Sequence, residues 1–80
     1  NVFPNPAGQK TSIELNLIEG AEVTMDVTDM AGRQAMKIFD GTMSDGITRV
    51  DVNTSALGKG VYLVNVKAGN SVTRKKLIIE

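Results

Sequence analysis

The chain has 80 residues, with nine Lys and Arg balanced by nine Asp and Glu, and it contains neither histidine nor cysteine. Without histidine there is no Ser-His-Asp or Cys-His catalytic site and no His-ligated zinc, and without cysteine no disulfide supports the small core. No apolar run approaches the ~20 residues of a membrane-spanning helix. These totals predict a single domain, residues 1–80, with a modest core, no cofactor or metal, and no direct insertion into a membrane.

The first strands are predicted from proline and from alternation. Pro4 and Pro6 favour extended backbone before them, so residues 2–3 are predicted to form a short edge strand or a packed arm. Residues 11–17 and 22–29 alternate apolar and polar side chains, which is typical of half-buried strands.

A hairpin follows these strands. Residues 29–32 end in glycine and form the predicted turn, and residues 33–39 return as a strand. The burial phase of the returning strand is ambiguous, because Met36 and Ile38 share one face while Phe39 lies on the other. We favour burial of Met36 and Ile38.

The middle of the chain predicts a loop and a further strand. Residues 40–46 contain two Asp-Gly pairs and are predicted as a loop, and their oxygen donors do not follow the spacing of a calcium-binding loop. Residues 47–52 resume the alternation, with Val50 and Val52 inward.

Residues 57–66 form the strongest block of the chain. Gly58, Lys59 and Gly60 predict a turn that leads into a strand with apolar side chains on both faces, which indicates a position inside a sheet. The Tyr62 hydroxyl needs a partner if its ring is buried. The turn is not a phosphate loop, because it lacks the earlier glycine and the following Ser or Thr and leads into a strand.

The last part of the chain is basic, whereas the part before it is acidic. Residues 68–71 predict a second hairpin turn, and residues 72–80 predict a last strand whose first half is basic and whose second half is apolar. From Thr54 onward five Lys and Arg accompany one Glu, whereas eight acidic and four basic residues precede that point. In the alternative interpretation, the lysines only protect a strand edge from aggregation.

The strands together predict a fold class. Roughly seven strands with regularly spaced turns and no helical periodicity indicate an all-β fold, an antiparallel Ig-like β-sandwich of about seven short strands, with an orthogonal barrel as the structural alternative. The predicted core consists of Phe3, Ile13, Leu15, Val23, Met25, Val27, Val50, Val52, Tyr62, Val64 and Val66.

Four motifs, in this order, resemble a known family. They are Phe3-Pro4-Asn5-Pro6, Asp29-Met30-Ala31-Gly32, Leu57-x-x-Gly60-x-Tyr62 and Lys75-Lys76-Leu77-Ile78-Ile79. Their order and spacing resemble the C-terminal sorting domain of type IX secretion system cargo, a family of Bacteroidetes-type Gram-negative bacteria, over essentially the whole chain. Met30-Ala31 in the hairpin turn and the final Glu80 depart from the usual pattern of that family.

The resemblance implies a non-catalytic export signal at the end of a larger secreted protein, with an N-terminal cargo domain. Such cargo crosses the inner membrane with an ordinary signal peptide, and its sorting domain is recognised in the periplasm by the type IX translocon and shuttle components. The cargo then reaches the cell surface or the medium. There a cysteine-protease-type sortase commonly cleaves the domain off, near Asn1 or before it, and joins the cargo to an anionic lipopolysaccharide.

We expect the last strand and the preceding glycine turn to carry recognition by the translocon. The residues assigned to it are Gly58, Lys59, Gly60, Lys75, Lys76, Leu77, Ile78, Ile79 and Glu80. If the last strand lies at a sheet edge, a partner strand can add to it by β-augmentation, and two copies can pair there as a homodimer. The alternative is that Leu77 and Ile79 belong to the core and the lysines are only solvated.

Other functions find less support in the sequence. An Ig-like or fibronectin-like spacer, or a carbohydrate-binding module of a secreted enzyme, is the alternative function, although sugar-binding faces present exposed aromatics and this chain has only Phe3, Phe39 and Tyr62. The carboxylates lie in turns and on solvent faces, so we expect no enzyme. The short basic cluster without interleaved aromatics predicts no binding to nucleic acid.

Overall fold

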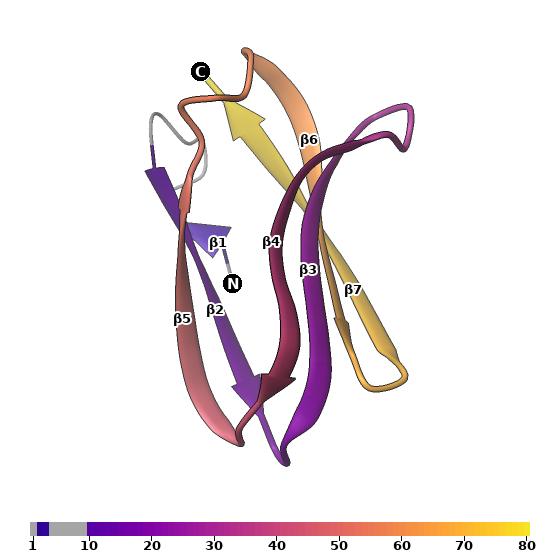
Figure 1. The fold of residues 1–80 in the computed structure, drawn as a ribbon. Helices are drawn as coiled ribbons and strands as arrows, with labels where there is room; N and C mark the ends of the chain where they lie inside the picture. The colour runs from indigo at the N-terminus through magenta and orange to yellow at the C-terminus, as the bar shows by residue number, and fades with distance from the viewer. Residues whose placement is uncertain (1, 4–9) are drawn as a thin grey trace.

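The computed structural model describes the backbone of residues 2–3 and all of residues 10–80 (Figure 1). Seven strands lie in this described part of the chain, and they confirm the all-β prediction. They are β1 (Val2–Phe3), β2 (Lys10–Leu17), β3 (Ala21–Asp29), β4 (Gln34–Met43), β5 (Gly46–Asn53), β6 (Gly60–Ala68) and β7 (Ser71–Ile79).

The strands form two antiparallel sheets that face each other as a sandwich (Figure 1). One sheet has the order β1-β2-β5 and the other the order β4-β3-β6-β7. The hairpins β3-β4 and β6-β7 lie side by side through the β3-β6 pair, while β2 pairs with β5 across the sequence. The arrangement is Ig-like, but the fourth strand pairs with the third, whereas in the constant-type Ig sheet it joins the sheet of the first strands.

The core fills the space between the inner faces of the two sheets. Its buried apolar residues are Ile13, Val23, Met25, Val27, Met43, Val52, Val64, Val66, Leu77 and Ile79. Leu15, Val50 and Tyr62 are partly buried and pack against this cluster. The predicted core position Phe3 lies outside the residues whose side chains the structure describes. Met43 is a core residue that the sequence analysis did not include, and the burial of Leu77 and Ile79 confirms the alternative interpretation that assigned them to the core.

The predicted loop over residues 40–46 is wrong. Strand β4 continues to Met43 and β5 begins at Gly46, so only residues 44–45 separate the two strands. Asp40 and Gly41 are paired in register with Thr24 and Val23 of β3. Pairing with a neighbouring strand outweighs the low strand propensity of an Asp-Gly pair.

A β-bulge resolves the ambiguous phase of β4. Met25 pairs with Phe39 and Asp26 with Lys37, so Ile38 is an extra residue on the β4 side. Before the bulge the favoured inward phase holds, because Met36 is opposite the buried Val27 and packs against the core. Ile38, in the bulge, is also partly buried against the core. After it the opposite phase holds, because Phe39 packs against the core as well.

Asp29 organises the turn between β3 and β4. Its Oδ1 accepts hydrogen bonds from the backbone N–H groups of Ala31 (2.9 Å) and Arg33 (3.0 Å), and its Oδ2 accepts one from Nε of Arg33 (3.0 Å). Gly32 adopts a positive φ of 89° at the end of the turn. These donors, the Arg33 backbone N–H foremost, lower the pKa of Asp29 below its ordinary value.

Candidate recognition surface

Strand β7 lies at one edge of the four-stranded sheet, next to β6 (Figure 1). Its residues from Ser71 to Lys76 are all exposed. The turn at Gly69 and Asn70 connects it tightly to β6, with a positive φ of 58° at Gly69. The position at an edge, on which the expectation of strand addition depended, is thus present in the structure.

The basic run of β7 is divided between the two faces of its sheet. Lys75 is opposite Val64, which is buried, so Lys75 has the register of the inner face. Arg74 and Lys76 are opposite Asn65 and Leu63 and lie on the outer face. The three cations therefore do not form one patch, and only Arg74 and Lys76 share the outer face.

The apolar end of β7 differs from the expected recognition surface. Leu77 is fully buried and Ile79 is 5% exposed, because both point inward against the second sheet. Their side chains are core and offer no contact surface on the folded protein, which corrects their assignment to direct recognition. Ile78 points outward between them and is partly buried.

The β6-β7 register brings together two segments that are separate in the sequence. Gly60 is opposite Ile79, and Val61 is opposite Ile78. The glycine turn and the end of the last strand therefore lie side by side. We call the exposed or partly exposed outward residues of this corner, together with the exposed Lys59 of the turn, the β6-β7 end patch, which consists of Lys59, Val61, Leu63, Lys76 and Ile78.

The glycine turn itself has a structural explanation. The Tyr62 hydroxyl donates a 2.7 Å hydrogen bond to the backbone carbonyl of Gly58, and Leu57 packs against the core. Gly60 has a φ of 152°. A tyrosine that bonds back to the backbone a few residues upstream is the tyrosine corner of Ig-type sandwiches. Leu57, Gly60 and Tyr62 of the motif thus hold the loop on the end of the sheet.

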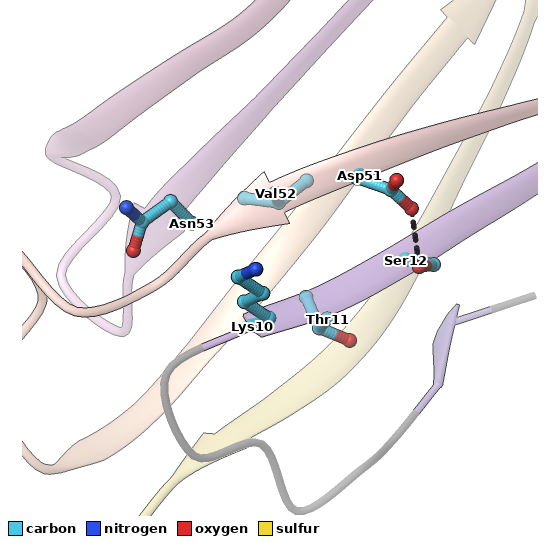
Figure 2. A pocket seen from close by; sticks show the side chains of 6 residues that line it. All are labelled: Lys10, Thr11, Ser12, Asp51, Val52 and Asn53. Atoms are coloured by element: carbon cyan, nitrogen blue, oxygen red, sulfur yellow. Dashed lines mark hydrogen bonds between the residues drawn. The ribbon is translucent and has the colours of Figure 1, made fainter.

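A hollow of about 330 Å³ lies over the start of β2 and the end of β5 (Figure 2). Its lining includes Ser12, whose Oγ donates a 2.7 Å hydrogen bond to Oδ1 of Asp51, and Arg49 approaches the same carboxylate oxygen at 3.9 Å. The carboxylate is therefore engaged by structural partners. Among the described residues that line the hollow, no second carboxylate could form an acid-base pair with Asp51.

Two further carboxylates are likewise in structural contacts. Asp26 accepts a 2.8 Å hydrogen bond from Nδ2 of Asn65, and Asp40 lies 3.1 Å from Nζ of Lys37. Among residues 10–80, no three acidic side chains gather in a way that could hold a metal ion. No helix in the described part is long and apolar enough to cross a membrane.

A family model described as the secretion system C-terminal sorting domain matches residues 1–80. The chain belongs to this family. A search of curated proteins found no match. The sorting domain is a non-catalytic signal of the type IX secretion system, it directs the secretion of its cargo, and it interacts with the secretion machinery. Type IX cargo is secreted or displayed on the cell surface.

Because the chain belongs to this family, the glycine turn and the end of β7 are parts of the sorting domain's pattern as well as structural elements of the sheet. The match extends from the first residue to the last, so it includes both the glycine turn and the end of β7. These are the segments that the β6-β7 register joins at one corner. Sequence reasoning selected both segments, but Val61 and Leu63 of the patch could be found only once the register was known.

Proposed function

We propose that the secretion machinery recognises the sorting domain at the β6-β7 end patch. The observation that carries the proposal is the register that places Gly60 opposite Ile79 and Val61 opposite Ile78. Val61 is 40% exposed although it is apolar, and the exposed cation of Lys76 lies beside it on the same face. An apolar centre with basic residues at its margin suits a partner of opposite charge.

The edge of β7 adds a second element to this interface. In an antiparallel ladder, alternate residues direct their backbone groups away from the paired strand. Counted from the turn at Gly69 and Asn70, Val72 and Arg74 direct theirs away from β6, where no described strand pairs with them. A strand of the translocon or of a shuttle component can add there by β-augmentation, with the end patch supplying side-chain contacts.

The proposed route follows from the family. The folded domain is recognised in the periplasm, the cargo crosses the outer membrane, and a cysteine-protease-type sortase cleaves before or near Asn1. The domain serves as a substrate in the cleavage step. Recognition in the folded state requires the core residues Leu77 and Ile79 only as supports of β7.

The first experiment asks whether the domain is sufficient for export. Residues 1–80 are fused to a fluorescent reporter that carries an inner-membrane signal peptide, and the fusion is expressed in a bacterium with an intact type IX system and in one without it. We expect reporter on the surface or in the medium of the first strain only. Intact, folded reporter in the periplasm of both strains would contradict the proposal and favour a spacer module.

The second experiment locates the surface with point variants. Deletion of residues 75–80 would remove Leu77 and Ile79 from the core, so it would not distinguish lost recognition from unfolding. The double variant Lys59→Glu and Lys76→Glu leaves the core intact. We expect secretion to fall at least about tenfold. A tenfold loss of binding corresponds to about 1.4 kcal/mol of binding free energy, which the reversal of two charges is sufficient to remove.

The double variant Lys10→Glu and Lys37→Glu is the matched control, because it also reverses two exposed cations, and they lie on β2 and β4, away from the β6-β7 hairpin. It is expected to be secreted normally. Equal secretion of the two double variants, with both folded, would place recognition elsewhere. Carbohydrate binding has no platform in the described residues, because the rings of Phe39 and Tyr62 pack against the core.

A further inference from the structure

A groove of about 650 Å³ opens between the two sheets at one side of the sandwich. Its walls come from the second half of β2 and the β2-β3 turn on one side and from the β6-β7 hairpin on the other. Leu15, Leu17, Val66 and Ala68 give it apolar walls, and Thr73 of β7 lies at its margin. On this side of the sandwich the described part of the three-stranded sheet ends at β2, because β1 pairs only with Ser12 and Ile13.

Strand β1 runs toward this groove when it is followed backwards along the chain. Phe3 is opposite Ser12, and Val2 is opposite Ile13. Each step toward the N-terminus in β1 is therefore a step toward Leu17 in β2. Beyond Ile13 no described strand pairs with β2 on the β1 side, and the antiparallel register assigns Leu15, Asn16 and Leu17 to the three positions before residue 1.

We propose that the segment joining the cargo to the sorting domain extends β1 along β2 and covers this groove. The occupant is the stretch of the secreted protein directly before residue 1. The proposal rests on the chain being the C-terminal domain of a cargo protein, as its family states, and not on which surface the translocon recognises.

The register also specifies the side-chain pattern of this segment. Paired residues of antiparallel strands point to the same face of the sheet. Leu15 and Leu17 pack toward the core, whereas Asn16 is exposed. The first and third positions before residue 1 therefore point into the groove and take small or apolar side chains, while the second points to solvent and takes a polar one.

Pairing of the joining segment has a consequence for its cleavage. A protease binds its substrate as an unpaired extended strand, so a segment held in a ladder is cut only after it detaches. The sorting domain would thus shield the junction until the domain is engaged or distorted by the secretion machinery. Cleavage would then follow recognition in time.

A disulfide test measures the pairing directly. In the complete secreted protein, Asn16→Cys is combined with a cysteine at the second position before residue 1, and oxidation is followed by peptide mapping. The domain itself has no cysteine to interfere. We expect efficient cross-linking, because facing residues of paired strands lie within disulfide distance. With the second cysteine moved to the first position, which faces the groove, cross-linking should be much slower.

A groove-filling variant gives an independent measurement. Thr73→Trp places an indole at the margin of the groove, and Arg74→Trp places the same side chain on the outer face of β7 as the matched control. Hydrogen exchange in the complete protein should show slowly exchanging amides before residue 1 in the wild type and in Arg74→Trp, and fast ones in Thr73→Trp. Fast exchange in the wild type, or equal cross-linking from both cysteine positions, would overturn the proposal even if export depends on the end patch.

Discussion

The hydroxyl of Tyr62 donates a 2.7 Å hydrogen bond to the carbonyl oxygen of Gly58, four residues earlier. The ring of Tyr62 packs against the core, and its register partner in β7 is the buried Leu77. One side chain therefore fixes the glycine turn to the same corner of the sheet that β7 completes. The shape of the end patch depends on this hydrogen bond, because Lys59 lies inside the loop that the bond closes.

Removal of the Tyr62 hydroxyl tests how much the hydrogen bond to Gly58 contributes to stability. Tyr62→Phe keeps the ring and should lower the free energy of unfolding by about 1 kcal/mol, the value of one hydrogen bond, as measured by urea denaturation. Tyr62→Ala also loses the packing of a partly buried ring and should cost about 2–4 kcal/mol. Equal stability of Tyr62→Phe and the wild type would show that the bond contributes nothing to folding.

The two glycines of the turn should differ in their tolerance of a side chain. Gly60 has a φ of 152°, which L residues rarely adopt, so Gly60→Ala should lower stability by about 1–2 kcal/mol. Gly58 has no positive φ, and an added Cβ would lie 3.8 Å from the Tyr62 hydroxyl, an ordinary contact. Gly58→Ala should therefore stay within about 0.5 kcal/mol of the wild type. The reverse order in thermal denaturation would contradict this account.

Substitutions at two adjacent residues near the end of β7 should distinguish the loss of core packing from the loss of surface contacts. Leu77→Ala empties a fully buried site and should cost about 2–5 kcal/mol, a large part of the about 4–12 kcal/mol expected for a domain of this length. Ile78→Ala removes a partly buried side chain on the outer face and should cost less than about 1.5 kcal/mol. Circular dichroism at 37 °C should show an unfolded fraction for Leu77→Ala alone. Comparable losses in both variants would mean that the outer face is also packed.

Much of the fold could be predicted because alternation along a strand records which face is buried. Residues 11–17 and 22–29 were predicted within one residue of β2 and β3 at each end, since their apolar positions alternate without interruption. The C-terminal end of β4 was not predicted, because Asp40 and Gly41 have low strand propensity. Pairing with β3 holds them in the strand. The bulge at Ile38 is also a property of the pair, and a single strand does not reveal it.

The candidate site was predictable in place but not in detail. A basic run at the end of the chain, next to a glycine turn in a strong strand, indicated where to look. The face that each residue takes depends on the register of β7 with β6, which turns Lys75 inward and Lys76 outward. The burial of Leu77 depends further on coverage by the second sheet. Neither the pairing of β7 with β6 nor its coverage by the other sheet can be predicted from the local sequence of β7.

The turn between β3 and β4 should make stability depend on pH through Asp29. Its carboxylate accepts hydrogen bonds from Arg33 and Ala31, and these lower its pKa in the folded state. A group with a lowered folded pKa contributes its full stabilisation above its ordinary pKa and loses it as the pH falls through the folded value. The contribution of Asp29 should therefore be complete at neutral pH and should disappear progressively below about pH 4.

Asp29→Asn and Asp29→Ala separate the charge from the turn geometry. An asparagine Oδ1 can still accept the backbone bonds of Ala31 and Arg33 but carries no charge for the Arg33 guanidinium. Thermal midpoints measured between pH 2 and pH 7 should rank wild type above Asn and Asn above Ala at neutral pH, and the gap between wild type and Asn should close in acid. A gap that stays constant over this range would show that the charge of Asp29 does not stabilise the hairpin, and that its oxygen atoms act only as uncharged acceptors.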